Sequence, residues 1–231
     1  MGNFPRIDRV LDFLFPRRCV GCGKEGNYIC AACFRSMPYL APPLCPKCGK
    51  PQPSGIHCPT CWGWHAEIDG IRSPFRFEGV IREAIHCLKY RNLKAISGSL
   101  AQLLAEYLSS NPPPAQALVP VPLHPRRLRE RGYNQSGLLA YKLGKLIGLP
   151  VIEGSLVRWR ETPPQARTAT AAARRSNVVG AFSCRDEKLK GKQVLLIDDV
   201  CTSGATLDSC AAALKAGGAI SVWGLTLARE I

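Results

Sequence analysis

The stretch that decides the fold is Val194 to Leu207, which reads Val-Leu-Leu-Ile-Asp-Asp-Val-Cys-Thr-Ser-Gly-Ala-Thr-Leu. Its first four residues, up to Ile197, are apolar and are followed by two acids, as in a buried parallel strand that reaches the carboxyl edge of an α/β sheet. After a short loop, an apolar-periodic segment runs to Gly217 and Gly218, which predict the end of a helix. The unit is strand, small-residue loop and helix, and we expect the functional site there.

The loop and the two acids offer different chemistry. A helix N-terminus opened by such a loop directs free N–H groups and a positive dipole end at one place, where a phosphate fits. Asp198 and Asp199 are hydrogen-bond acceptors when ionised, so they suit sugar hydroxyls or hydrated magnesium beside that phosphate. The turn therefore predicts a ligand with one phosphate and one polyol, together with one hard cation.

This stretch resembles the phosphoribosyl pyrophosphate (PRPP) motif of type I phosphoribosyltransferases, which has four apolar residues, two acids, one apolar residue and a Thr/Ser-rich loop with glycine. The resemblance implies that Asp198 and Asp199 hold the ribose 2′- and 3′-hydroxyls. The residues implied to hold the 5′-phosphate are Thr202, Ser203, Gly204, Ala205 and Thr206. The acidic strand end of a nucleotide hydrolase reads similarly, but it needs a G-x-x-x-x-G-K-[ST] loop, which this sequence lacks.

Length and charge narrow the class of protein. A chain of 231 residues has room for one core of about 100 to 200 residues and a small module. A hydrophobic content of 46% excludes a disordered chain. The formal charge of +14 suggests polyanionic ligands: PRPP and pyrophosphate, and nucleic acid as a further candidate. Charge alone does not separate these ligands from a merely solvated basic face.

Cysteine content bears on the compartment. No apolar run approaches the roughly 18 residues of a membrane span, and the N-terminus lacks the pattern of a signal peptide, so we expect a cytoplasmic protein. Twelve cysteines in a reducing compartment argue against a disulfide framework and favour metal binding.

Eight of the twelve cysteines form four C-x-x-C pairs within 43 residues. The pairs are Cys19 with Cys22, Cys30 with Cys33, Cys45 with Cys48, and Cys58 with Cys61. Two such knuckles complete a tetrahedral site of four thiolates, so the sequence predicts two structural Zn²⁺ ions. Sequential pairing is the simpler arrangement and crossed pairing stays open, as do redox C-x-x-C chemistry and an iron–sulfur cluster.

The zinc pairs suggest the domain organisation. We expect an amphipathic helix at residues 1–16, a double zinc ribbon at 17–65 and an α/β domain at 68–231, with a doubly wound, mostly parallel sheet. The ribbons are basic, and Trp62 and Trp64 offer aromatic surfaces that either stack on bases or pack the module onto its neighbour.

Four arginines follow a second buried strand, which we expect at Ala117 to Val121. They are Arg126, Arg127, Arg129 and Arg131. The loop at this place in the related enzymes binds pyrophosphate, which the rigid fork of arginine suits. The string Arg-Gly-Tyr-Asn-Gln that ends at Gln135 extends the resemblance to the ComF competence family, a phosphoribosyltransferase-like domain behind a zinc module. A solvated arginine cluster remains the alternative interpretation.

A third element is expected between Arg158 and Asn177. The resembled family has a similar series there, in a flexible lid that closes over PRPP and excludes water. The resemblance implies lid roles for Arg160, Gln165 and Arg167. The segment that ends at Phe182 leads into a predicted strand. The other elements predicted from periodicity are strands at 71–77 and 219–228 and helices at 80–88, 93–108 and 134–147.

The resemblance implies a Mg²⁺-dependent transfer of phosphoribose from PRPP to an unknown nitrogen acceptor, with release of pyrophosphate. Asp198, Asp199 and Arg131 are the expected catalytic residues, with the acids facing the ribose and the arginine facing the leaving group. The alternative is a nonenzymatic, PRPP-sensing adaptor whose ribbons bind single-stranded DNA or a DNA-uptake helicase, because binding PRPP does not require stabilising a transition state.

Overall fold

The computed structural model of the protein describes residues 16–161 and 178–231. The helix predicted at 1–16 therefore falls outside the described residues, apart from Pro16. Within the described ranges no helix is both long and apolar enough to cross a lipid bilayer.

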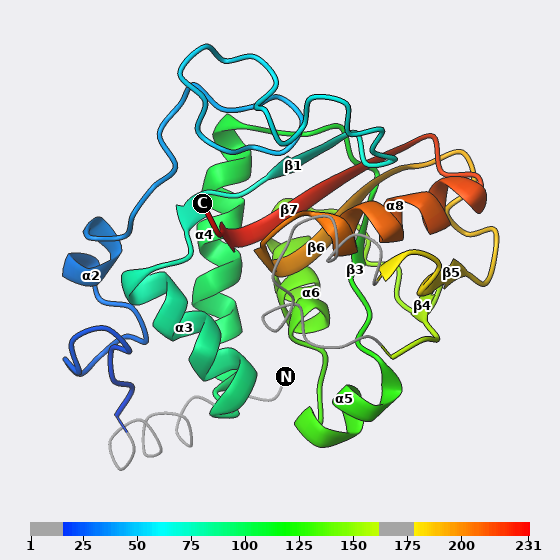
Figure 1. Cartoon of the computed structure of the whole chain (residues 1–231). Coiled ribbons are helices and arrows are strands. Elements are labelled where there is room, and N and C mark those ends of the chain that lie inside the picture. The colour runs from blue at the N-terminus through cyan, green and yellow to red at the C-terminus, as the bar shows by residue number, and fades with distance from the viewer. Residues whose placement is uncertain (1–15, 162–177) are drawn as a thin grey trace.

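A parallel sheet forms the centre of the molecule, with the strand order β1-β7-β6-β3 (Figure 1). The two inner strands are β6 (Gln193–Cys201) and β7 (Ser221–Arg229), and β3 (Ala117–Pro120) pairs with β6. The apolar run of β6 is buried on both faces, as the sequence predicted for a central parallel strand.

The other edge of the sheet consists of two short strands where the sequence predicted one at 71–77. β1 (Gly70–Arg72) and β2 (Phe75–Arg76) both pair with β7, and Ser73 and Pro74 separate them. Proline has no backbone N–H to donate, which explains the interruption of the ladder.

Helices cover both faces of the sheet, as predicted for a doubly wound fold. Leu195 and Ile197 of β6 pack in one core with α3 (Gly79–Tyr90), α4 (Ser97–Ser110) and α6 (Gln135–Ile147). Val194 and Leu196 point the other way and pack in a second core with α8 (Ala205–Ala216). Because side chains alternate along a strand, these two cores lie on opposite faces, and α8 lies across the sheet from α4 and α6 (Figure 1). The predicted helix at 93–108 begins with a short 3₁₀ turn, η1 (Lys94–Ile96).

A separate two-stranded antiparallel sheet lies beside α8. It pairs β4 (Leu156–Arg158) with β5 (Phe182–Cys184). The sequence indicated a strand near Phe182 but not its partner, because β4 is only three residues long and has little periodicity to read.

The cysteine-rich segment has little regular structure beyond α2 (Ala31–Arg35). The part around α2 lies beside α3, and the part that follows lies over β1 (Figure 1). A segment this small cannot bury a core of its own, so its cysteine clusters take that place.

The central strand offers a test of the packing. Truncating Leu196→Ala should lower the free energy of unfolding by about 2 to 5 kcal/mol, because Leu196 is fully buried between β6 and α8. Truncating the exposed Leu146→Ala on α6 should change it by less than about 0.5 kcal/mol. Urea unfolding with zinc present measures both. Similar losses in the two variants would contradict the placement of β6.

Candidate functional site

The two acids lie inside the last part of β6, because the strand continues to Cys201. Part of the Asp198 residue is exposed, but its carboxyl group is surrounded by protein atoms. Its Oδ1 accepts hydrogen bonds from Ser136 Oγ at 2.8 Å and from the backbone N–H of Asp199 at 2.9 Å. Asp199 is 3% exposed and forms an ion pair with Lys89 of α3, with 2.7 Å between Lys89 Nζ and Asp199 Oδ2. Adjacent acids on one strand thus have different environments.

Burial and neighbouring charges shift the pKa values of Asp198 and Lys89 in this cluster. Burial raises the pKa of Asp198 to about 7, and the neighbouring charge of Asp199 adds to the rise. Burial by itself would lower the pKa of Lys89, but the charge of Asp199 outweighs it, so the pKa of Lys89 is raised and its ammonium keeps its proton. The site therefore holds one firmly paired carboxylate and one carboxyl that titrates near neutral pH.

The small-residue loop turns from β6 into α8 within three residues, from Thr202 to Gly204. Gly204 has a φ of 82°, a left-handed conformation that favours glycine, and it caps the 12-residue helix α8. Ala205 and Thr206, predicted as loop residues, form the first turn of this helix, and Ser203 Oγ accepts from Ala205 N at 3.4 Å. The helix N-terminus thus opens directly at the loop, as the sequence predicted.

The arginine-rich segment is helical, so the prediction of an open loop after β3 is wrong. Residues Pro125–Arg131 form α5. His124 caps its N-terminus by accepting from Arg126 N at 3.4 Å, and Gly132 ends it in a left-handed conformation. Proline at the first helical position and glycine just beyond the last one are helix signals that the sequence already carried.

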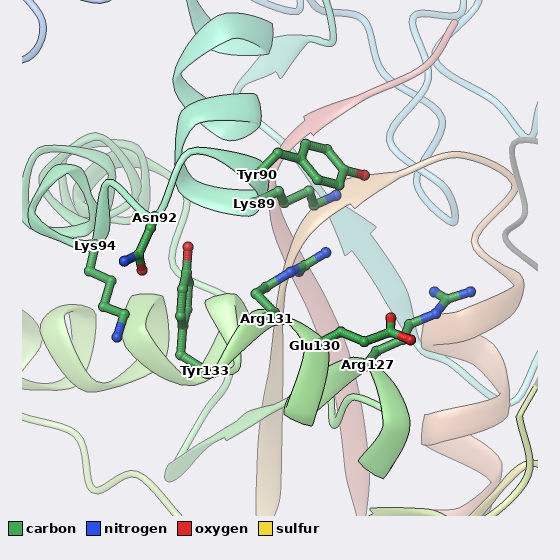
Figure 2. Close-up of a pocket in the computed structure, with 9 residues that line it drawn as sticks. Lys89, Tyr90, Asn92, Lys94, Arg127, Glu130, Arg131 and Tyr133 are labelled. Carbon is green, nitrogen blue, oxygen red and sulfur yellow. The ribbon is translucent and has the colours of Figure 1, made fainter.

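A cavity of about 700 Å³ separates the end of α3 from α5 (Figure 2). Its lining combines four cations, one acid, two tyrosines, an amide and a glycine. These residues are Lys89, Lys94, Arg127, Arg131, Glu130, Tyr90, Tyr133, Asn92 and Gly132. Because Lys89 also pairs with Asp199, the cavity adjoins the acids of β6. An anion with several charges fits such a lining.

The four arginines of α5 have different surroundings. Arg127 and Arg131 line the cavity, and Arg131 donates a short hydrogen bond to Gln135 Oε1 while lying 5.6 Å from the ring centre of Tyr90. Arg126 forms ion pairs with two glutamates, and Arg129 is exposed and outside the cavity lining. The two cavity arginines therefore suit an anion better than the other two.

Two of the three expected lid residues, Gln165 and Arg167, lie outside the described residues. Arg160 lies within them, and its Nη2 donates to the carbonyl of Val179 at 2.8 Å. Arg158, at the end of β4, is closer to the site: burial and the charge of Arg127 lower its pKa. It is a further cation near the cavity that the sequence did not single out.

The eight cysteines form two tetrads in sequential order, which excludes the crossed pairing. They are Cys19, Cys22, Cys30 and Cys33, and Cys45, Cys48, Cys58 and Cys61, with the sulfur atoms within each tetrad no more than 4.8 Å apart. Burial alone would raise the pKa of Cys45, but backbone N–H groups stabilise its thiolate and lower the pKa to about 6. Four thiolates in a closed, mostly buried group fit a structural Zn²⁺ ion.

Comparisons with known proteins agree with this arrangement. The double zinc ribbon domain model matches residues 10–62, and the phosphoribosyl transferase domain model matches residues 131–229. Competence protein F of Haemophilus influenzae is 31% identical over 230 residues, covering 93% of this chain and 98% of that protein. Competence protein ComFC of Bacillus subtilis is 28% identical over 215 residues, covering 90% of this chain and 86% of that protein.

A third relative is the DNA utilization protein YhgH of Salmonella typhi, 31% identical over 204 residues, covering 84% of this chain and 88% of that protein. Solved structures match a smaller part: the glutamine PRPP amidotransferase of B. subtilis is 21% identical, covers 55% of this chain and 25% of that chain, and has a TM-score of 0.38.

Fold and cysteine tetrads together define a protein with a type I phosphoribosyltransferase-like domain behind a double zinc ribbon. Two competence proteins match most of this chain and most of their own length. The chain belongs to the ComF family of competence proteins, which confirms the resemblance inferred from its motifs.

Sequence reasoning missed Lys89 and Ser136, which contact the two acids. Lys89 carried a usable signal, because it directly follows the helix predicted at 80–88 and lies four residues after Ile85 and eight after Ile81, in line with the apolar face of that helix. A lysine in such a position needs a buried partner. Ser136 gave no comparable signal, because its contact with Asp198 joins residues that are 62 positions apart.

The raised pKa of Asp198 predicts an unusual pH dependence of stability. A carboxyl whose pKa is higher in the folded than in the unfolded protein stabilises the fold only while protonated, so this contribution is lost as the pH rises from about 4 to about 7. At pH 8 the free energy of unfolding of Asp198→Asn should therefore exceed that of the wild type by about 1 to 3 kcal/mol, with a smaller difference at pH 6. Urea unfolding at the two pH values measures both differences. If the Asp198→Asn variant is less stable than the wild type at pH 8, the assignment is contradicted.

Proposed function

We propose that this chain binds Mg²⁺-PRPP and transfers its phosphoribosyl group to a nitrogen acceptor, with release of pyrophosphate. The observation that carries the proposal is the placing of three subsites at one edge of the sheet: the acids of β6, the N-terminus of α8 and the cationic cavity beside α5. Ribose, 5′-phosphate and pyrophosphate are the three parts of PRPP that these subsites suit.

Each subsite has a distinct task. Asp198 and Asp199 accept hydrogen bonds from the ribose hydroxyls, while the helix N-terminus at Thr202 to Thr206 holds the 5′-phosphate. Arg127 and Arg131 bind the pyrophosphate from the cavity side. Bound magnesium would share the charge of that pyrophosphate, and the acids and the phosphate oxygens are its preferred type of ligand.

The reaction breaks the bond between ribose C1 and pyrophosphate oxygen, and the pyrophosphate leaves with the electron pair. A bond from C1 to the acceptor nitrogen forms, and the acceptor releases a proton. Positive charge grows on the ribose beside Asp198 and Asp199, and negative charge grows on the leaving group beside Arg131. Fixed charges of opposite sign on the two sides of the breaking bond lower the barrier.

Two further expectations stay predictions: the division of the chain at residues 17–65 and 68–231, and the cytoplasmic location. The acceptor is specified by its class alone, a nitrogen nucleophile.

Arg131 and Arg129 provide a matched test on one helix. Arg131→Ala should reduce turnover of PRPP by about 100- to 1,000-fold once an acceptor is found, because it removes one charge from the leaving-group side. Before that, calorimetry with Mg²⁺ should show weaker PRPP binding for Arg131→Ala and unchanged binding for Arg129→Ala, because Arg129 is exposed outside the cavity.

The same titration includes the double variant Asp198→Asn/Asp199→Asn, which should lose the magnesium-dependent part of the binding. Equal PRPP affinity in Arg131→Ala and the wild type would contradict the role of Arg131 in binding pyrophosphate. A folded wild type that does not bind PRPP at all would overturn the proposed function.

A second candidate function is an adaptor that binds single-stranded DNA, and one observation favours it. Phe77, His86 and Tyr90 form an aromatic row beside α3, with ring centres 6.0 Å and 5.7 Å apart. Arg82 lies 6.0 Å from the Phe77 ring centre and Arg131 lies 5.6 Å from that of Tyr90. Rings at least partly exposed and interleaved with cations suit unpaired bases and the phosphates between them.

Tyr90→Ala tests this candidate, because Tyr90 is 71% exposed. If the row binds DNA, the variant should bind a fluorescent single strand about 5- to 100-fold more weakly, since stacking on one aromatic contributes about 1 to 3 kcal/mol. Tyr141→Ala is the control, because Tyr141 is an exposed tyrosine of α6 with Lys145 at 4.4 Å. Unchanged binding in both variants would contradict a role for the row and indicate general charge attraction, which raising the salt concentration would weaken.

A further inference from the structure

Trp64 packs against the phosphate loop. It follows the last cysteine of the second tetrad, and its backbone N–H donates to the carbonyl of Cys61 at 3.1 Å. A Cβ atom added to Gly204 would lie 3.1 Å from Trp64 Cη2 and 2.9 Å from Ile71 Cδ1. The indole and Ile71 therefore close off one side of the glycine on which the turn into α8 depends.

The turn that contains Cys45 and Cys48, the first knuckle of the second tetrad, is hydrogen-bonded to β1 at the edge of the sheet. The N–H of Ile71 donates to the carbonyl of Lys47 at 2.8 Å, and Arg72 Nη1 donates to the carbonyl of Pro46 at 2.9 Å. A Cβ atom on Gly49 would lie 2.6 Å from the Ile71 carbonyl oxygen, so the two backbones are in direct contact. The position of Ile71 under Gly204 is thus set by the knuckle of the second tetrad.

Arg229 joins the same knuckle to the end of β6. It is 1% exposed, and its Nη1 donates to the carbonyl of Cys48. Arg229 also lies opposite Cys201 in the register of β7 with β6, and the N–H of Glu230 donates to the Cys201 carbonyl at 2.9 Å. A zinc ion with four thiolates has a net charge of about −2, which a buried arginine offsets.

A cavity of about 190 Å³ lies between the second tetrad and the loop. Lys50, Thr60 and Trp64 line it from the zinc ribbon, and Thr202 and Ser203 line it from the loop. On the side of Thr202 and Ser203, the phosphate loop therefore faces the zinc ribbon across this cavity.

We propose that the second zinc ribbon is a wall of the ribose-phosphate site, and that Trp64 is the residue that positions the phosphate loop. This inference rests on the proposed function and assigns the second Zn²⁺ ion a task that the first does not share. The first tetrad packs against Ile29 of its own segment and Val80 of α3, and none of its cysteines lines the cavity beside the loop. Loss of metal from the second tetrad should free Trp64 and Ile71 from Gly204 and so lower the affinity for PRPP.

Trp62 and Trp64 form a matched pair for the test. In zinc-replete protein, Trp64→Ala should weaken Mg²⁺-PRPP binding by about 10-fold or more, which corresponds to about 1.4 kcal/mol, whereas Trp62→Ala should leave it within about 2-fold. Trp62 is the control because it is 77% exposed. Calorimetry gives the affinities, and zinc content and the thermal transition show whether each variant is folded. Normal PRPP affinity in a folded Trp64→Ala variant would overturn the inference.

A measurement on the unaltered fold covers the case in which Trp64→Ala does not fold. Fluorinated tryptophan is incorporated into the wild type, which has four tryptophans, and Trp64→Phe and Trp62→Phe identify the fluorine signals of these two. Addition of Mg²⁺-PRPP should shift the Trp64 signal and leave the Trp62 signal in place. A Trp64 signal that does not move while calorimetry shows binding would overturn the inference and leave the proposed function intact; absence of binding to the wild type would overturn both.

The two tetrads provide a third comparison. Cys58→Ser should lower PRPP affinity more than Cys30→Ser, in variants that each keep one Zn²⁺ ion per chain. Equal affinities in the two variants would show that zinc acts on the fold as a whole and would contradict a separate task for the second ribbon.

Discussion

Two adjacent carboxyl groups at the end of a buried strand are the constraint on which the other parts of the site depend. Water cannot solvate them fully, so the protein must supply their partners, and it does so from two different helices. Lys89 reaches Asp199 from the end of α3, and Ser136 reaches Asp198 from the start of α6. These contacts join both helices to β6, and Lys89 also lines the cavity between α3 and α5.

The unequal treatment of the two acids has chemical meaning. Asp199 is paired with the ammonium of Lys89, whereas Asp198 has a hydroxyl and a backbone N–H as partners, and burial raises its pKa to about 7. In the proposed function, the two vicinal hydroxyls of a ribose would therefore meet two acids with different hydrogen-bond partners. Removing Lys89 would leave the buried Asp199 without its counter-ion, which is more costly than replacing both residues by apolar ones.

Much of the fold could be predicted from the sequence where the signals are local. The run that ends at Ile197, the turn at Gly204 and the spacing of the cysteines each determine structure within a few residues. Contacts between distant segments could not be predicted: β4 has its partner more than 20 residues away, and the contact of Trp64 with Gly204 joins two modules. The arginine helix α5 is intermediate, because its capping residues were present but the resemblance favoured a loop.

In the strand order β1-β7-β6-β3, the last strand of the chain, β7, lies between the first strand, β1, and β6. Gly70 lies opposite Trp223, so the edge that supports the second zinc knuckle can form only after almost the whole chain has left the ribosome. The cysteine tetrads, by contrast, close over short segments near the start and require little chain entropy to form. During synthesis the ribbons can therefore bind metal before β7 has been made, and they can pack onto the sheet only after β7 has paired with β1.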